Sequence, residues 1–280
     1  MEMFARRAFE VTGLLLSIVA LAFSVREYFE FEHQKAAYSK QTQNLLEIQR
    51  KVDLAASEAT TRSIGEFPKN IPTIISVVKH ACATLDIMAD TASYGMISSP
   101  DDFFNYLHAL ENMSSATLAD RYTSGECSRL QAEVDPKKRV HVRLLIYDQA
   151  TLGDVVSTQF NEKTFDSLAN SSKFQVFFHD HNIPQPSNYK DLVAAILGTS
   201  FDYARQLAKN RIEVRVSTQR YMVYVWMRDS AEAAFSLDYQ GASKDDVEQE
   251  LAFATKDANL TAAFQKIFEQ EWKKSKEFTP

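Results

Sequence analysis

Histidines and arginines are the residues whose types and spacing could support chemistry in this chain. His179 and His181 flank Asp180 and form a His-x-His pair, which could supply two ligands to a metal ion. No third ligand is indicated nearby, and a polar loop before Pro184 explains the same residues more simply. We therefore expect neither a metal nor another cofactor.

Four arginines, at positions 211, 215, 220 and 228, are close in sequence around apolar segments with strand-like alternation. Alternation would place Arg211, Glu213 and Arg215 on one face of a strand. Such a face could form a residual anion site, or it could be an ordinary solvated surface with charges of both signs.

Motifs of several large enzyme classes are missing from the sequence. It contains no GxxxxGK[ST], GxGxxG or GxSxG, which disfavours P-loop NTPases, dinucleotide binders and α/β-hydrolases. The formal net charge of -6 argues against broad, non-specific binding to nucleic acid or anionic lipid. We therefore do not expect nucleic acid as a partner.

The N-terminal segment has the composition of a membrane anchor. Residues 11–25 carry no charge and follow Arg6 and Arg7, so residues 1–25 are predicted to be an uncleaved, single-pass transmembrane anchor. Basic residues on the two flanks favour a cytosolic C-terminal domain. The alternative is a cleaved signal peptide, because Ala20-Leu21-Ala22 has the small-x-small form of a cleavage site.

Residues 26–66 are predicted to form a helical stalk. The segment consists mostly of good helix formers and has no proline or glycine before Gly65. Tyr38, Leu45 and Val52 recur every seven residues, as in a coiled-coil seam. This seam could hold two stalks in parallel, which predicts a homodimer, or a single helix could rest its apolar stripe on the domain.

Residues 67–280 alternate helix-like and strand-like apolar spacing, which predicts one α/β domain with a mixed sheet. The clearest strand is RVHVRLLIYD, where Val142 and Leu144 lie on one face and Arg143 on the other. Within residues 149–186, a helix is expected around Phe165 to Ala169, and the apolar run QVFFH could be strand or helix, so the segment as a whole is left undecided. The expected elements are helices at 74–82, 103–110, 190–208 and 260–268 and strands at 85–89, 140–147, 212–216, 222–227 and 233–239.

The order of these elements resembles a phospholipase D-like module over about residues 68–276. In its second half, Asp229-Ser230 resembles the family's Asp-Gly turn, and Phe235 to Asp238 resembles its Gly-Ser-x-Asn element. The family's conserved acid would be Glu248 or Glu250, and its closing helix would carry Phe264, Phe268 and Trp272. This resemblance implies an α/β/α fold with a mixed sheet.

The chain departs from the family at the catalytic positions. The family's His-x-Lys motif supplies a nucleophile and a phosphate-binding cation, and these positions correspond to Met222 and Tyr224. The thioether of Met222 is not a phosphate nucleophile, and the neutral phenol of Tyr224 supplies no positive charge. Phe235 replaces a glycine and is expected to crowd a phosphate pocket. The side chains that could still bind a ligand are Tyr224, Asp229, Ser236, Asp238 and Arg215.

Two functions follow as hypotheses. The first is a membrane-anchored, non-catalytic phospholipase D-like module that binds, senses or acts as a scaffold for an unknown protein partner. The alternative is a membrane-bound phosphodiesterase or nuclease with a non-consensus site drawn from His141, His179 or His181 and the arginines.

Overall fold

The computed structural model describes residues 60–123, 137–160, 162–237 and 251–279. The predicted anchor at 1–25 and nearly all of the predicted stalk lie outside these residues, as do Asp238, Glu248 and Glu250. No helix in the described ranges is long and apolar enough to cross a membrane.

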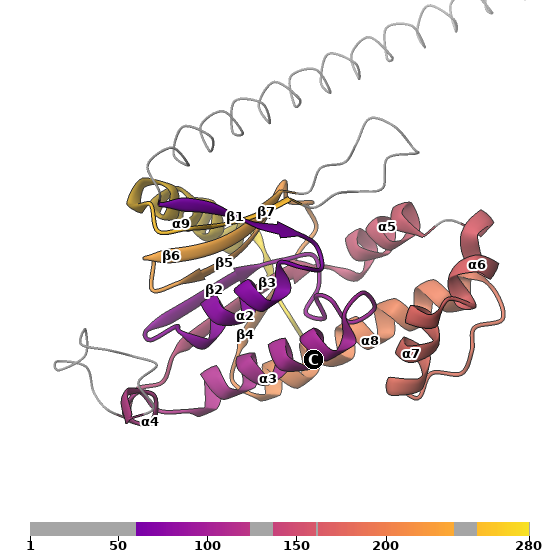
Figure 1. Ribbon diagram of the computed structural model, residues 1–280, viewed down its shortest axis with the longest axis horizontal. Helices are drawn as coiled ribbons and strands as arrows, with labels where there is room; N and C mark the ends of the chain where they lie inside the picture. Colours follow the sequence, from indigo (N-terminus) through magenta and orange to yellow (C-terminus); the bar gives the residue numbers. More distant parts are fainter. Residues whose placement is uncertain (1–59, 124–136, 161, 238–250, 280) are drawn as a thin grey trace, which may run out of the picture. The chain divides into compact units, whose positions relative to one another are not determined.

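Strands and helices are interspersed along the described chain (Figure 1). The strands are β1 (Thr61–Glu66), β2 (Thr84–Met88), β3 (His141–Tyr147), β4 (Glu213–Ser217), β5 (Val223–Arg228), β6 (Glu232–Leu237), β7 (Leu251–Thr255) and β8 (Lys276–Glu277). The helices are α2 (Ile71–Lys79), α3 (Pro100–Ser115), α4 (Leu118–Thr123), α5 (Gln149–Gln159), α6 (Phe165–Ala169), α7 (Ser172–Asp180), α8 (Tyr189–Lys209) and α9 (Ala258–Lys274).

All of these strands belong to one eight-stranded mixed sheet with the order β1-β7-β6-β5-β2-β3-β4-β8. Strands β2, β3 and β4 are parallel, and the other pairings are antiparallel. Parallel neighbours need a crossover connection. Helices α3 and α4 provide it between β2 and β3, and α5 to α8 provide it between β3 and β4. The predicted mixed α/β class is confirmed.

The two faces of the sheet meet different helices. On one face, Trp226 of β5 donates its indole N–H to the Tyr106 hydroxyl of α3 at 3.0 Å. On the other face, the Arg143 guanidinium of β3 lies 4.8 Å from the centre of the Phe268 ring of α9. Since successive side chains of a strand alternate between faces, these contacts define an α3 face and an α9 face of the sheet.

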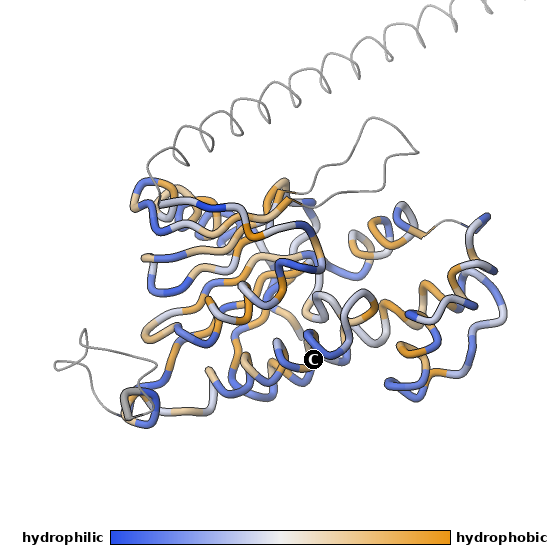
Figure 2. The backbone as a smooth tube through the Cα atoms, viewed as in Figure 1, coloured by the Kyte–Doolittle hydropathy of each residue, from blue (hydrophilic) through white to orange (hydrophobic). Residues whose placement is uncertain are grey.

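Apolar residues are concentrated along the strands, and the helices alternate apolar and polar positions (Figure 2). In α8, for example, Leu192, Ile196, Ala204 and Leu207 are buried at helical spacing. Its N-cap residue Asn188 accepts a hydrogen bond from the Asp191 N–H at 3.0 Å, which stabilises the first turn. The amphipathic pattern predicted for this helix is therefore confirmed.

The undecided segment 149–186 is helical in its described elements α5, α6 and α7. The apolar run QVFFH lies within α7, where Phe174, Phe177 and Phe178 are buried. Their spacing of three and four residues places them on one helical face.

The predicted helical stalk at 26–66 is wrong at its C-terminal end. Residues 61–66 form strand β1 rather than helix, and they pair with β7, where Thr61 lies opposite Thr255. The two threonine hydroxyls are 2.8 Å apart in a buried hydrogen bond. This pairing between distant segments overrides local helix propensity, so the domain begins before Thr61 and not at residue 67.

Candidate ligand-binding site

A cavity of about 170 Å³ lies at the carboxyl end of β2. Here β2 has a parallel neighbour, β3, on one side and an antiparallel neighbour, β5, on the other. Ligands of α/β proteins commonly bind at the carboxyl ends of parallel strands, where the loops diverge. The cavity is lined by the loop after β2, by α5 and α8, and by Tyr224 of β5 on the α3 face.

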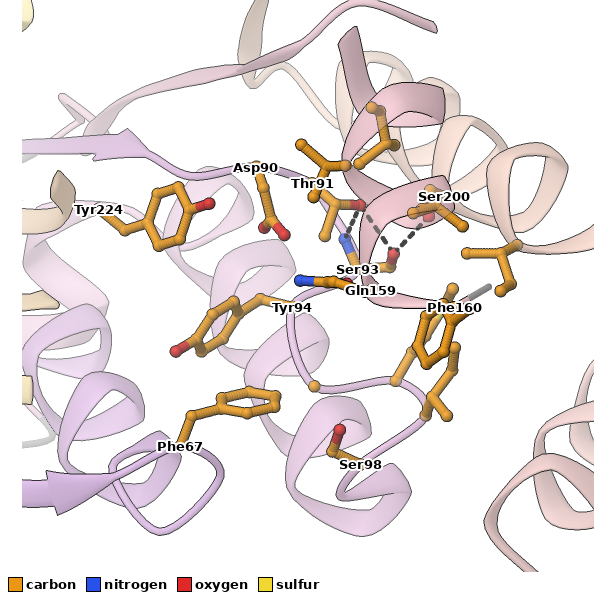
Figure 3. Close-up of a pocket in the computed structure, with 17 residues that line it drawn as sticks. Phe67, Asp90, Thr91, Ser93, Tyr94, Ser98, Gln159, Phe160, Ser200 and Tyr224 are labelled. Carbon is orange, nitrogen blue, oxygen red and sulfur yellow. Dashed lines mark hydrogen bonds between the residues drawn. The ribbon is translucent and has the colours of Figure 1, made fainter. Parts of the chain in front are cut away.

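A chain of hydroxyl groups fixes the loop after β2 against α8 (Figure 3). The Thr91 and Ser93 hydroxyl oxygens are 2.9 Å apart, and Ser93 Oγ is 2.9 Å from Ser200 Oγ. The Ser93 N–H also donates to Thr91 Oγ1 at 3.2 Å. Ser93 and Ser200 are buried, so these bonds hold the polar wall of the cavity in one arrangement.

Aromatic side chains make the opposite wall. Tyr94 contacts Phe67 and Trp226 with ring centres 5.0 and 4.8 Å apart, and its hydroxyl accepts a hydrogen bond from Asn70 at 3.1 Å. The turn at Gly95 has φ +90°, and a Cβ there would lie 2.7 Å from Ile71 Cδ1. Glycine therefore allows this loop to pass closely over α2.

Asp90 supplies negative charge to the cavity. Among the described residues that line it, Asp90 is the only acid, and none is a lysine, arginine or histidine. Figure 3 shows the Tyr224 hydroxyl directed toward Asp90. Burial raises the pKa of nearby Tyr106, a hydrogen bond from Trp226 opposes this, and the Asp90 charge raises the pKa further. The field of Asp90 thus reaches the core beside the cavity.

Of the predicted ligand residues, Tyr224 lines this cavity and Ser236 lies beside it. Tyr224 is buried in the cavity wall, and Ser236 of β6 is its cross-strand partner on the same face. Ser236 is fully buried, and its hydroxyl has no hydrogen-bond partner among the described residues. Met222 is 37% exposed just before β5. Asp238 lies outside the described residues.

Asp229 does not reach the cavity and is a correction to the predicted site. It lies at the opposite end of β5, with φ +52° in the turn to β6. Its carboxylate accepts hydrogen bonds from the backbone N–H groups of Cys82, Ala83 and Thr84 at 2.6 to 3.1 Å. These bonds occupy the carboxylate and hold the start of β2 next to β5. Asp229 therefore has a structural role.

Arg215 is also a correction, because it lies on the α9 face. Its guanidinium donates to the Trp272 carbonyl at 3.0 Å and lies 4.9 Å from the centre of the Trp272 ring. Arg228 instead pairs with Glu232 and donates to the His80 carbonyl. Arg215 and Arg228 therefore hold separate packing contacts and do not form one anion site.

Phe235 does not crowd the cavity, contrary to the prediction. Its side chain lies on the α9 face, where its ring centre is 5.4 Å from that of Phe253 and 4.8 Å from that of Phe264. Strand alternation explains the difference, since neighbours on one strand point to opposite faces.

The three candidate histidines lie on different parts of the fold. His141 Nε2 is 2.9 Å from Glu213 Oε1 at the amino end of β3. His179 is exposed on α7, while His181 contacts Tyr203 of α8 at 3.2 Å, and partial burial lowers its pKa. Within the described ranges, no group of three or more His, Cys, Asp or Glu side chains could hold a metal ion.

Sequence reasoning missed the loop residues Asp90, Thr91 and Ser93. The signal that could have found them is a polar run directly after a buried strand, β2. In an α/β sheet this position faces the ligand-binding edge.

Comparison with known proteins finds similarity at the level of the fold. No family model matches the chain, and no curated protein matches it significantly. The structure of TrmBL2, an archaeal chromatin protein described as showing a novel mode of DNA binding, has 12% identity and a TM-score of 0.37, with coverage of 86% of this chain and 67% of that one.

Two further similar structures are those of Nuc and of a phosphatidylserine synthase. Nuc, a phospholipase D family member from Salmonella typhimurium, has 10% identity and a TM-score of 0.40, with 79% of this chain and 98% of that chain covered. Phosphatidylserine synthase from Haemophilus influenzae Rd KW20 has 8% identity and a TM-score of 0.37, with 75% and 36% covered. The chain thus spans about a third of the synthase. It is similar in structure to phospholipase D family members, and no activity, substrate or partner follows from similarity this distant.

Proposed function

We propose that this protein is a non-catalytic, phospholipase D-like binding module held at a membrane by residues 1–25. One observation carries the proposal. Tyr224, at the position expected for the family's phosphate-binding lysine, lines a cavity whose described residues include an acid but no lysine, arginine or histidine.

The chemistry of the cavity supports binding rather than phosphodiester cleavage. Covalent phosphoryl transfer needs a nucleophile and positive charge around the phosphate oxygens. Met222 is a poor phosphate nucleophile, and the neutral phenol of Tyr224 supplies no positive charge. The candidate histidines give no alternative site, since they lie on separate elements.

Hydrolysis assays on the detergent-solubilised full-length protein test this proposal. We expect no turnover of bis(4-nitrophenyl) phosphate or single-stranded DNA above that of a buffer control. The matched variants are His141→Ala, His179→Ala and His181→Ala. Turnover in the wild type that disappears in any of the three would establish the enzyme alternative and reject the inert module.

Membrane attachment is a separate part of the proposal. The uncharged segment 11–25 and its basic flank support an uncleaved anchor. Membrane fractionation and the intact mass of the purified chain test it. We expect the full mass in the membrane fraction, whereas a soluble chain beginning at Phe23 would identify a cleaved signal peptide.

We also propose a homodimer joined through the stalk. Two chains anchored in one membrane meet at raised effective concentration, and the heptad at Tyr38, Leu45 and Val52 could pair them. Light scattering of the solubilised full-length protein should give a dimer, and Leu45→Asp with Val52→Asp should give a monomer. A wild-type monomer at micromolar concentration would reject the dimer, and a dimer that survives both substitutions would reject the stalk as its interface.

A further inference from the structure

The geometry points to a neutral ligand with one ring and one hydrogen-bonding group as the occupant of the cavity at the carboxyl end of β2. This inference rests on the proposed binding function, and it names the chemical class of ligand that the cavity accepts. The size of the cavity, its apolar wall and its hydroxyl groups each support it.

The size and the apolar wall of the cavity suit a single ring. Its volume of about 170 Å³ is close to that of an apolar cavity known to hold benzene. Phe67, Tyr94 and Phe160 contribute aromatic rings from three separate segments of the chain. Leu152 and Ile196 add aliphatic surface from α5 and α8. The carbon atoms of a ring would therefore leave water for apolar surroundings, which favours binding.

Contacts with other rings hold the aromatic wall in position. The Tyr94 ring centre lies 5.0 Å from that of Phe67 and 4.8 Å from that of the buried Trp226. The Phe160 ring centre lies 5.5 Å from that of Phe174 on α7. Side chains that are already packed lose little conformational entropy when a ligand binds. The wall is therefore ready to receive a ring without rearrangement.

The polar wall can bind the neutral polar group of such a ligand (Figure 3). A hydroxyl group has one donor and two acceptor positions. The hydrogen bonds of Thr91 Oγ1 given above both go to Ser93 and use two of these three positions, so the third can serve a ligand. Ser98 and Gln159 also line the cavity. Their side chains both donate and accept, which suits an amide or a hydroxyl group.

The charges at the cavity do not favour a charged ligand. None of the described lining residues is a lysine, arginine or histidine, and a buried carboxylate without a cation is costly. Asp90, the one acid among them, already interacts with other groups of the protein. An incoming cation would have to compete with those groups, whereas a neutral polar group needs no counter-charge.

Three ring compounds of one shape and different charge test the inference. Benzamide is neutral, benzoate is an anion and benzamidinium is a cation, and each is titrated calorimetrically into the detergent-solubilised full-length protein at one ionic strength. We expect benzamide to bind most tightly of the three. Benzoate should bind at least about 10-fold more weakly than benzamide, because the described walls supply no cation for a buried carboxylate.

Val155→Phe tests whether the ring occupies the cavity. Val155 of α5 is buried and lines it, so the added ring should fill the space that benzamide needs. The benzamide affinity should fall by at least about 10-fold. Val176→Phe is the matched control, since Val176 of α7 is 44% exposed and does not line the cavity, and it should bind benzamide as the wild type does. Heat from mixing with the detergent is common to both variants, so their difference isolates the cavity.

Thr91→Val tests the polar wall and keeps the experiment decisive if Val155→Phe does not fold. Valine has the shape of threonine without its hydroxyl group, so the benzamide affinity should fall several-fold, as expected for one lost hydrogen bond. Thr158→Val is the matched control, because Thr158 is exposed on α5 and does not line the cavity. It should leave the benzamide affinity unchanged. Thermal unfolding of each variant confirms that it is folded.

The outcomes separate this inference from the proposed function. No binding of benzamide, equal or tighter binding of a charged probe, or benzamide binding that Val155→Phe and Thr91→Val leave unchanged would overturn the neutral-ligand site. The hydrolysis assays would still decide whether the module is inert. Phosphodiester turnover together with benzamide binding that these variants weaken would reject the inert module and keep the neutral-ligand site.

Discussion

The α9 face and the α3 face of the sheet both contain buried polar side chains, but those side chains have different surroundings. On the α9 face, Arg143 donates to both Asp86 oxygens at 2.7 and 2.9 Å and to Glu269 at 2.7 Å. Gln265 donates to Asp86 and Glu269 at 3.2 Å. The rings of Phe268 and Trp272 cover the guanidinium, so this charged cluster is closed by the protein itself.

On the α3 face, the polar side chains at the carboxyl end of β2 surround a cavity. Asp90 and Thr91 line it together with Tyr224, and no basic side chain is among the described lining residues. The comparison shows that the charged groups on the α9 face are paired with other protein groups and so stabilise the fold. At the diverging end of the sheet, polar side chains instead border a cavity, which is where ligands of α/β proteins commonly bind.

Removing Arg143 should have the largest effect. Arg143→Met leaves the Asp86 side chain, which is 3% exposed, without its cation. Breaking one partner of a buried pair costs about 3 to 5 kcal/mol of unfolding free energy, measured by urea denaturation. Arg143→Met with Asp86→Leu is the control and should recover most of this loss. A single-variant loss below about 1 kcal/mol would show that water solvates Asp86 and that the cluster is not closed.

Trp272→Ala should be next in size, at about 3 kcal/mol. The indole is 8% exposed, its ring centre is 5.4 Å from that of Phe268, and Arg143 and Arg215 lie over it. Trp272→Phe keeps part of this packing and should cost less. Thermal and urea unfolding measure both variants. A loss well under 1 kcal/mol for alanine would place the side chain outside the core and weaken the phospholipase D-like alignment of α9.

Asp229→Ala should cost about 2 kcal/mol, because backbone N–H groups of Cys82, Ala83 and Thr84 lose a charged acceptor. The loss is smaller than for Arg143 because Asp229 is partly exposed and water can replace some of these bonds. Asp229→Asn keeps one acceptor oxygen and should lose about half as much. Unchanged stability of Asp229→Ala would show that the carboxylate does not hold β2 against β5.

Local patterns of sequence predicted the elements but not the contacts between distant segments. Alternation around Arg143 identified β3, and helical spacing identified α8, because both patterns are long. The run around Phe177 was too short to distinguish helix from strand. Strand β1 depends on its pairing with β7, and the role of Asp229 depends on the backbone at Cys82. Such contacts have no signal in the local sequence.

One residue that lines the cavity was singled out from the sequence. Tyr224 was found through the family resemblance, since it occupies a motif position, and cross-strand register then brings Ser236 beside it. Asp90 was missed because an acid after a strand looks like the start of an ordinary loop. Its importance follows from the sheet order, in which β5 rather than another parallel strand lies beside β2.

The contribution of Glu269 to stability should depend weakly on pH. Its hydrogen bond from Arg143 lowers the pKa of the carboxyl, and partial burial opposes the shift. A lowered folded-state pKa means that the stabilisation is present above about pH 4.5, the ordinary value, and is lost as the pH falls through the folded-state pKa. Glu269→Gln should therefore be less stable than the wild type at pH 7 and approach it at lower pH. A difference that is constant across this range would contradict the ion pair.

Ser236→Ala should have the smallest effect on the unfolding free energy, and it tests a buried polar group on the α3 face. The hydroxyl is fully buried on the α3 face and has no hydrogen-bond partner among the described residues, so its removal leaves no donor or acceptor newly unsatisfied. The unfolding free energy should change by less than about 0.5 kcal/mol, or increase. A loss above about 1 kcal/mol would mean that a bound water or another group uses the hydroxyl in the folded state.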